Sequence, residues 1–220
     1  MSGTAKRSLI AVILTALVCG AIGLYIGLYL INVPGSVAAV STPTGPHLYL
    51  ATVATAEATD PHPTWVSYYG VDANSANWRH DTTFVLPANT LVHVTIYQYD
   101  TATGLRNPFL SQPAGTVGPV LINGQSTAVV DPTTPGHTFA IPDIGLSIPL
   151  PGASSTAKNL CTQAPCSLSQ AHETITFTFK TPPKGLYRWQ CFVPCGAGFI
   201  QGNGGPMQTV GYMGGFIKVV

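Results

Sequence analysis

The chain carries very little charge for its length. Only 8% of its 220 residues are Asp, Glu, Lys or Arg, against about 25% in an average soluble domain. The formal net charge is +1, and no basic cluster is longer than Lys6-Arg7. Because phosphate binding needs a basic surface, nucleic acid is excluded as the main partner. A coiled coil, a charge-rich disordered chain and a fully solvated helical protein fit this composition equally poorly.

The motifs of common enzyme classes are also missing. The sequence has no Gly-rich phosphate loop, no G-x-S-x-G and no H-E-x-x-H. Its eight carboxylates are too few to single out a pair for acid/base chemistry. These absences argue against an enzyme that acts alone.

What the sequence does have, first of all, is one long apolar run. Residues 9–31 contain no charge, and at about 1.5 Å per residue a helix of this length crosses the roughly 30 Å hydrocarbon core of a bilayer. Lys6 and Arg7 precede the run, and the next basic residue is Arg79. The positive-inside rule therefore predicts a single-pass anchor over 1–31 in the cell membrane, with a cytoplasmic N-terminus and an extracytoplasmic C-terminal domain.

Two other readings of the apolar run are less favoured. A cleaved signal peptide has an apolar region of only about 7 to 15 residues. A lipoprotein signal would use Cys19, but Val18 is too large for the small residue expected just before a lipidated cysteine. We therefore expect a retained anchor.

The rest of the chain divides into a linker and a β domain. Residues 32–63 are rich in Pro, Ser, Thr, Ala and Val and predict an extended tether, with room for one strand at "HLYLATVAT". Residues 64–220 show short β-prone runs broken by Gly, Pro, Asn and Asp, and no sustained helical period. About seven to nine short strands of this kind predict a mainly β fold, either a single β-sandwich or a small Greek-key barrel.

The cysteines outside the anchor form two pairs. Cys161 and Cys166 lie in the loop "NLCTQAPCSL", which has no neighbouring histidine. In an oxidising compartment this pattern predicts a local disulfide. Cys191 and Cys195 lie instead in "GLYRWQCFVPCGAG", with Met207 further along the chain.

A histidine strand completes a possible metal site. His137 stands in "GHTFAIPDIG". Thiolate, thioether and imidazole groups on a rigid β scaffold are a ligand set for copper in electron transfer, because soft sulfur suits Cu(I). Copper is therefore the expected cofactor.

These segments resemble a known family. The stretch "GHTFAIPDIG" is similar to the first-histidine strand of cupredoxin domains, and "GLYRWQCFVPCGAG" resembles the C-x-x-x-C-G loop of cytochrome c oxidase subunit II. The similarity covers most of 80–220 and implies a cupredoxin-like Greek-key β-sandwich. In that family a copper pair is held by two cysteines, two histidines, a methionine and a backbone carbonyl. The resemblance places His137, Cys191 and Cys195 at ligand positions and Val193 at the position of the carbonyl ligand.

The sequence departs from the family pattern just after the second cysteine. The family's second histidine falls at Phe199, and the methionine expected three residues later falls at Gly202. Met207 follows a short glycine-rich insertion and is the nearest substitute. An intact copper pair is therefore not expected. The two cysteines either hold a single copper with His137 and Met207, form a disulfide or remain reduced.

The remaining histidines are expected to be structural or solvated, and only two of them are kept as outside candidates for ligands. The two candidates are His80 and His172, and the others are His47, His62 and His93.

Two hypotheses follow for the whole chain. The first is a membrane-anchored, cupredoxin-like protein that takes part in respiratory electron transfer at the outer face, as a possible subunit of an oxidase complex. The second is a metal-free accessory subunit that keeps the fold and docks on other subunits of a membrane complex. The second hypothesis is supported by Phe199 at the ligand position and by the low charge, which leaves weakly polar surface for neighbours to cover.

Overall fold

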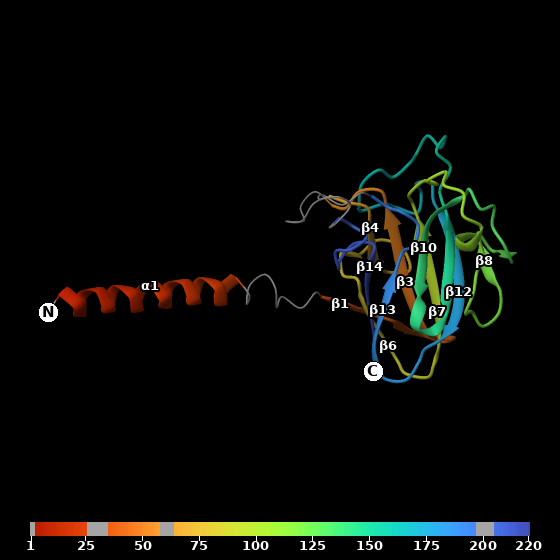
Figure 1. The fold of residues 1–220 in the computed structure, drawn as a ribbon. Coiled ribbons are helices and arrows are strands. Elements are labelled where there is room, and N and C mark those ends of the chain that lie inside the picture. Colours follow the sequence, from red (N-terminus) through yellow and green to blue (C-terminus); the bar gives the residue numbers. More distant parts are fainter. Residues whose placement is uncertain (1–2, 26–34, 58–63, 197–204) are drawn as a thin grey trace. The chain divides into compact units, whose positions relative to one another are not determined.

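The computed structural model describes residues 3–25, 35–57, 64–196 and 205–220 (Figure 1). The chain divides into two compact units, an N-terminal unit up to Pro34 and a second unit from Gly35 to Val220. The first contains one helix, and the second contains the β-strands.

The N-terminal unit holds helix α1 (Gly3–Tyr25). Its side chains from Arg7 to Leu24 are exposed on every face, and nearly all of them are apolar. A helix that is apolar all round is typical of a membrane span. By length and composition, the segment Arg7–Leu24 is able to cross a membrane.

The second unit is a sandwich of two β-sheets (Figure 1). The first sheet has six strands in the order β1 (Ser36–Ala38), β6 (Thr83–Leu86), β14 (Gly214–Val219), β13 (Gly185–Gln190), β10 (Pro135–Ile141) and β11 (Leu146–Pro151). The second runs β5 (Trp78–Arg79), β4 (Ser67–Val71), β3 (Gly45–Val53), β7 (Leu91–Gln98), β12 (Glu173–Lys180), β8 (Val120–Ile122) and β9 (Gln125–Thr127), and β2 (Val40–Thr42) pairs with β3. Two short 3-10 turns, η2 (Pro108–Ser111) and η3 (Pro142–Ile144), lie between strands. The predicted mainly β class and β-sandwich are confirmed.

The core forms where alternate side chains of the two sheets meet. On β7, Val92, Val94 and Ile96 are fully buried, as their period of two predicts. From the other sheet, Phe139 and Trp189 pack into the same cluster. Each buried side chain of this size stabilises the fold by about 1.5–3 kcal/mol relative to full exposure, so the alternation accounts for much of the stability of the sandwich.

The segment expected to be a tether belongs to the β domain. Residues 35–53 supply β1, β2 and β3, and β3 lies inside the second sheet, antiparallel to β4 and parallel to β7. Leu48 and Leu50 on β3 are buried in the core, which explains why this segment docks. Residues 32–34 and 58–63 of the predicted tether lie outside the described residues.

The number of strands also differs from the expectation. The described residues contain fourteen strands, and five of them are only two or three residues long. Strands this short cannot show a period of two in the sequence, which explains the lower expected number.

Candidate metal centre

His137 lies on strand β10, whose seven residues are all buried. The strand pairs along its length with β11 and touches β13 through Ala140 and Gln190. The pairing with β11 shifts register between Pro135 and His137, so the strand is irregular just where it presents the imidazole. Only 1% of His137 remains exposed.

The two cysteines come from the loop that follows β13. Cys191 is the first residue after the strand, and its N–H donates to the carbonyl of Met213 at 2.8 Å. Cys195 follows four positions later and is 8% exposed, while Cys191 is completely buried. Because Gln190 pairs with Ala140 of β10, the loop starts beside the strand that carries His137.

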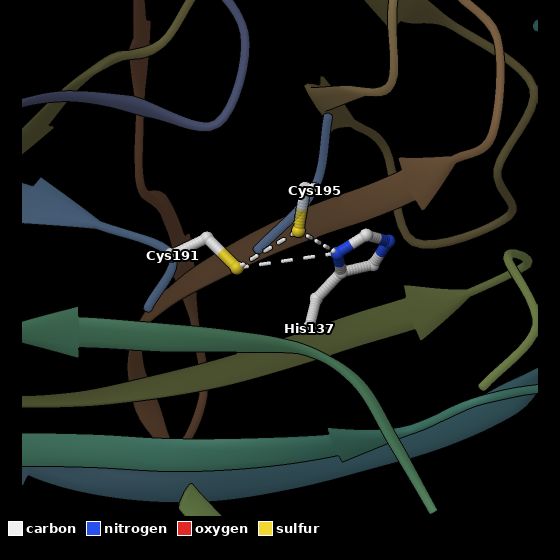
Figure 2. A group of neighbouring side chains, drawn as sticks. All are labelled: His137, Cys191 and Cys195. Atoms are coloured by element: carbon white, nitrogen blue, oxygen red, sulfur yellow. Dashed lines mark hydrogen bonds between the residues drawn. The ribbon is translucent and has the colours of Figure 1, made fainter. Parts of the chain in front are cut away.

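The three side chains converge on one point (Figure 2). Nδ1 of His137 lies 2.9 Å from Sγ of Cys195 and 3.9 Å from Sγ of Cys191. The two sulfurs are 3.4 Å apart and are not bonded to each other. All three ligand atoms lie within 4.8 Å of one another, a spacing that a metal ion could bridge.

A backbone carbonyl completes this cluster. The oxygen of Val193 lies 3.0 Å from Sγ of Cys195 and 3.5 Å from Sγ of Cys191. Four donor atoms of three kinds therefore face one buried point: two sulfurs, one imidazole nitrogen and one carbonyl oxygen.

The second nitrogen of His137 has a carboxylate partner. Nε2 lies 3.0 Å from Oδ2 of Asp100, which follows the end of β7. Sequence reasoning missed Asp100, because no motif surrounds it and its partner is 37 positions away. It is the only acidic residue paired with this histidine among the residues that the structure describes.

The electrostatics of the cluster favour one thiolate and one thiol. Burial opposes the charged form of His137, but the hydrogen bonds to Asp100 and Cys191 raise its pKa to about 9. Burial likewise opposes the thiolate of Cys191, but its hydrogen bonds with Cys195 and His137 lower its pKa well below the usual range. The hydrogen bond to Cys191 and burial raise the pKa of Cys195. These pKa shifts favour the thiolate on Cys191 and the thiol on Cys195.

Two methionines contact the start of the cysteine loop through their backbone carbonyls, Met207 at Gln190 and Met213 at Cys191. The carbonyl of Met207 accepts a hydrogen bond from the side chain of Gln190 at 3.5 Å, and its own side chain packs half-buried against the core. Met213 is fully buried, and its N–H donates to the carbonyl of Pro206 at 3.1 Å. The sequence positions of the family's missing ligands, Phe199 and Gly202, lie outside the described residues.

The other described histidines lie apart from this cluster. His47 and His93 bind threonine hydroxyls on the outer face of the second sheet, at 2.8 Å and 2.9 Å. His80 stacks on Tyr69 with ring centres 4.5 Å apart, and His172 packs near Tyr99 at 5.1 Å. His62 lies outside the described residues.

The first cysteine pair is separate from the site. Cys161 and Cys166 form a disulfide with their Cα atoms 5.8 Å apart. Both are buried in a second, smaller hydrophobic cluster with Tyr99. The disulfide therefore belongs to the packing of the domain and not to the cluster of His137, Cys191 and Cys195.

Comparison with known proteins gives similarity only to solved structures. No protein-family model and no curated protein matches the chain. The copper protein rusticyanin aligns over 86% of each chain with 17% identity and a TM-score of 0.36. Rusticyanin from Thiobacillus ferrooxidans aligns over 86% of this chain and 85% of its own, with 16% identity and a TM-score of 0.34. A chain of a heme-copper terminal oxidase dimer aligns over 99% of each chain, with 13% identity and a TM-score of 0.30.

These neighbours are thus structures of rusticyanin and of a heme-copper terminal oxidase. Because these identities and TM-scores are low, only the site's own geometry indicates its chemistry. That geometry is the buried meeting of His137, Cys191, Cys195 and the carbonyl of Val193.

Proposed function

We propose that this protein is a membrane-anchored, cupredoxin-like copper protein that transfers electrons. The observation that carries the proposal is the buried meeting of two cysteine sulfurs, Nδ1 of His137 and the carbonyl oxygen of Val193. Thiolate and imidazole together favour copper over hard cations such as Mg²⁺ and Ca²⁺. Copper, when bound, supplies one-electron redox chemistry at this point.

The surrounding residues fit such a group. The N–H of Thr138 donates to Sγ of Cys191 at 3.3 Å, as expected for a sulfur that carries negative charge. Asp100 occupies Nε2 of His137, so Nδ1 is the nitrogen that faces the sulfurs. Ligands fixed by a second layer of hydrogen bonds are typical of metal sites in proteins.

Burial favours electron transfer over catalysis at the metal. His137, Cys191 and Cys195 are at most 8% exposed, so a substrate would have little access to an ion held between them. Electron transfer requires no such access. The protein residues therefore keep water out and hold the ligands in place.

The site favours one copper ion and not a pair. Among the described residues, only one histidine joins the two cysteines, and the family position of a second one is Phe199 in the sequence. A copper pair would leave one ion short of a ligand. Met207 is the proposed further donor to the single ion, and its backbone carbonyl accepts a hydrogen bond from the side chain of Gln190, the residue before Cys191.

The same proposal includes a location and partners. Helix α1 would hold the domain at the outer face of the cell membrane, and the scarcity of charge favours contact with other subunits of a respiratory oxidase complex. Exposed apolar side chains on the β domain support such contacts: Leu105, Phe109, Val117, Val129 and Phe192. Leu105 also lines a hollow of about 160 Å³ together with Val193 and Pro194 of the metal loop.

Copper loading of the full chain tests the proposal. The chain with Cys19→Ser, whose anchor contributes no thiol, is purified in detergent, reduced, freed of reductant and titrated with Cu(II). We expect about one copper per chain by metal analysis, a strong thiolate-to-copper absorption and a copper spin signal. Cys191→Ser and Cys195→Ser should each abolish the absorption, whereas Cys161→Ser with Cys166→Ser should keep it.

A colourless chain that retains no copper would overturn the proposal. The alternative, a metal-free accessory subunit, is then tested by peptide mapping. The protein is isolated from its native membrane and digested without reductant. A Cys191–Cys195 disulfide there would favour a metal-free accessory subunit, since the two sulfurs are already 3.4 Å apart.

A further inference from the structure

Asp100 stands directly behind the histidine of the site. Its Oδ2 lies 3.0 Å from Nε2 of His137, on the opposite side of the ring from the two sulfurs. The histidine side chain is 2% exposed, whereas the aspartate side chain is 22% exposed. The carboxylate is therefore the polar group that links the buried ring to the protein surface.

The carboxylate is itself held in place. Its second oxygen, Oδ1, accepts the N–H of Thr101 at 2.7 Å. The carbonyl of Asp100 accepts the N–H of Ala153 at 2.8 Å, and Thr101 forms a bridge with the same residue. Both the backbone and the side chain of Asp100 are therefore fixed before any metal binds.

Two glycines allow the segment carrying Asp100 to approach the histidine strand. A Cβ added to Gly136 would lie 2.6 Å from the carbonyl oxygen of Thr101, and one added to Gly152 would clash with the nitrogen of Ala102. Contacts below 3.0 Å force the backbone to shift. Since glycine has no Cβ, these two positions let the Asp100 segment pack directly on one end of the β10–β11 pair, where β10 begins and β11 ends.

We infer that Asp100 is the positioning residue of this centre, which binds the Nε2 proton of His137 and so presents Nδ1 to a soft metal ion. This inference rests on the proposed metal site and extends it to a residue outside the ligand set. A carboxylate behind a ligating histidine fixes the ring orientation and increases the basicity of the ligand, and its loss costs roughly 10- to 100-fold in metal affinity.

The first measurement needs no metal. In the reduced, metal-free full chain, NMR of ¹⁵N-labelled histidine should show a slowly exchanging Nε2 proton on His137. Asp100→Ala should remove this signal, because the acceptor is lost. If the wild-type chain shows no protected Nε2 proton, the inference is overturned regardless of what copper does.

The second measurement uses two soft ions. The full chain is titrated with Cu(I) under a competing chelator and with Cd²⁺, which reports thiolate binding by ultraviolet absorption and has no redox chemistry here. Asp100→Asn and Asp100→Ala should weaken both ions by roughly 10- to 100-fold. Asp100→Glu should recover part of the affinity, and the exposed Asp143→Asn serves as the control with the same change in charge.

Two further measurements separate the effect of the position of the Asp100 carboxylate from the effect of its charge. Gly152→Ala keeps the carboxylate but displaces the segment that carries it, so it should also weaken Cd²⁺ binding. In the copper-loaded chain, Asp100→Asn should raise the reduction potential, because less negative charge is left to stabilise Cu(II), whereas a purely structural role would leave the potential unchanged.

The outcomes distinguish the inference from the proposed function. If the wild type binds Cd²⁺ but not copper, the proposed function fails, and the positioning role is still decided by the Asp100 variants. If Asp100→Ala binds both ions as tightly as the wild type, the positioning role is wrong while the copper site stands. If the wild type binds neither ion, both are overturned.

Discussion

The backbone of Thr138 binds the sulfur of Cys191, and its side chain binds the next residue of the loop. Its backbone N–H donates to Sγ of Cys191 at 3.3 Å, and its hydroxyl oxygen accepts the N–H of Phe192 at 2.8 Å. Because Thr138 follows His137 on β10, one strand carries the imidazole and also fixes the start of the cysteine loop. The ligand geometry is therefore built into the sheet and not left to the loop alone.

The variant Thr138→Val tests this arrangement. Valine keeps the branched shape and the backbone N–H but removes the hydroxyl that holds Phe192. A partly buried donor left without its acceptor costs about 1–3 kcal/mol, so we expect a loss of this size in urea unfolding of the reduced, metal-free chain. Thr176→Val on the outer face of β12 is the matched control and should change the free energy of unfolding by less than about 0.5 kcal/mol. Equal effects of the two variants would contradict the role of Thr138.

The core of the fold could be predicted because its signal is local. Val92, Val94 and Ile96 show a period of two in the sequence, and the structure buries all three. In the segment 35–53, the stretch "HLYLATVAT" predicts one strand and forms most of β3, but β1 and β2 have three residues each and give no such signal. Its docking depends on the burial of Leu48 and Leu50 against strands from elsewhere in the chain, which composition does not reveal.

The site likewise has residues that the sequence predicts and one that only the tertiary structure reveals. His137, Cys191 and Cys195 stand in recognisable segments, and the structure brings them together. Asp100 stands at the end of the segment "YQYD", which carries no motif. Its importance arises only when the end of β7 and the start of β10 meet, which is a property of the tertiary structure.

Trp189 connects the loop that carries Cys191 and Cys195 to the core. Its ring is fully buried between Tyr68, at 4.7 Å between centroids, and Phe84, at 5.4 Å. Its Nε1–H donates to the carbonyl of Thr82 at 2.8 Å. The residue therefore contributes both packing and a buried hydrogen bond.

We expect Trp189→Phe to lower the free energy of unfolding by about 2–4 kcal/mol. The smaller ring leaves a cavity, and the carbonyl of Thr82 loses one of its two donors and keeps the N–H of Phe216. Chemical denaturation of the metal-free chain measures the change. Phe109→Leu, at a residue that is 76% exposed, should stay within about 0.5 kcal/mol of the wild type. A loss below about 1 kcal/mol for Trp189→Phe would show that the core repacks around the site.

Removing the disulfide should affect stability and not metal binding. Cys161 and Cys166 are five positions apart, and the chain-entropy relation gives about 2 kcal/mol for so short a loop. Cys161→Ala with Cys166→Ala should lower the free energy of unfolding by about this amount. Copper uptake by the same variant should match the wild type, and reduced uptake would mean that this loop supports the metal centre.

The carboxylate of Asp72 organises the turn after β4. It accepts the N–H of Ala76 at 2.8 Å and the N–H of Asn74 at 3.2 Å, and it also binds the side-chain amide of Asn77. The hydrogen bond from Ala76, followed by those from Asn77 and Asn74, lowers the pKa of Asp72 from its usual value of 3.8. These bonds favour the ionised carboxylate in the folded chain.

The sign of the pH dependence follows from this shift. A carboxyl group whose pKa is lower in the folded state stabilises the fold above its unfolded pKa, and this stabilisation is lost as the pH falls through the folded pKa. The stability difference between the wild type and Asp72→Ala should therefore be constant above about pH 5 and shrink as the pH falls below 3.8. Asp72→Asn keeps an acceptor oxygen but does not titrate, so its difference from Asp72→Ala should not change with pH. Unfolding curves of the three chains between about pH 2 and pH 7 measure both differences, and a wild-type advantage that grows toward low pH would show that the turn does not favour the ionised carboxylate.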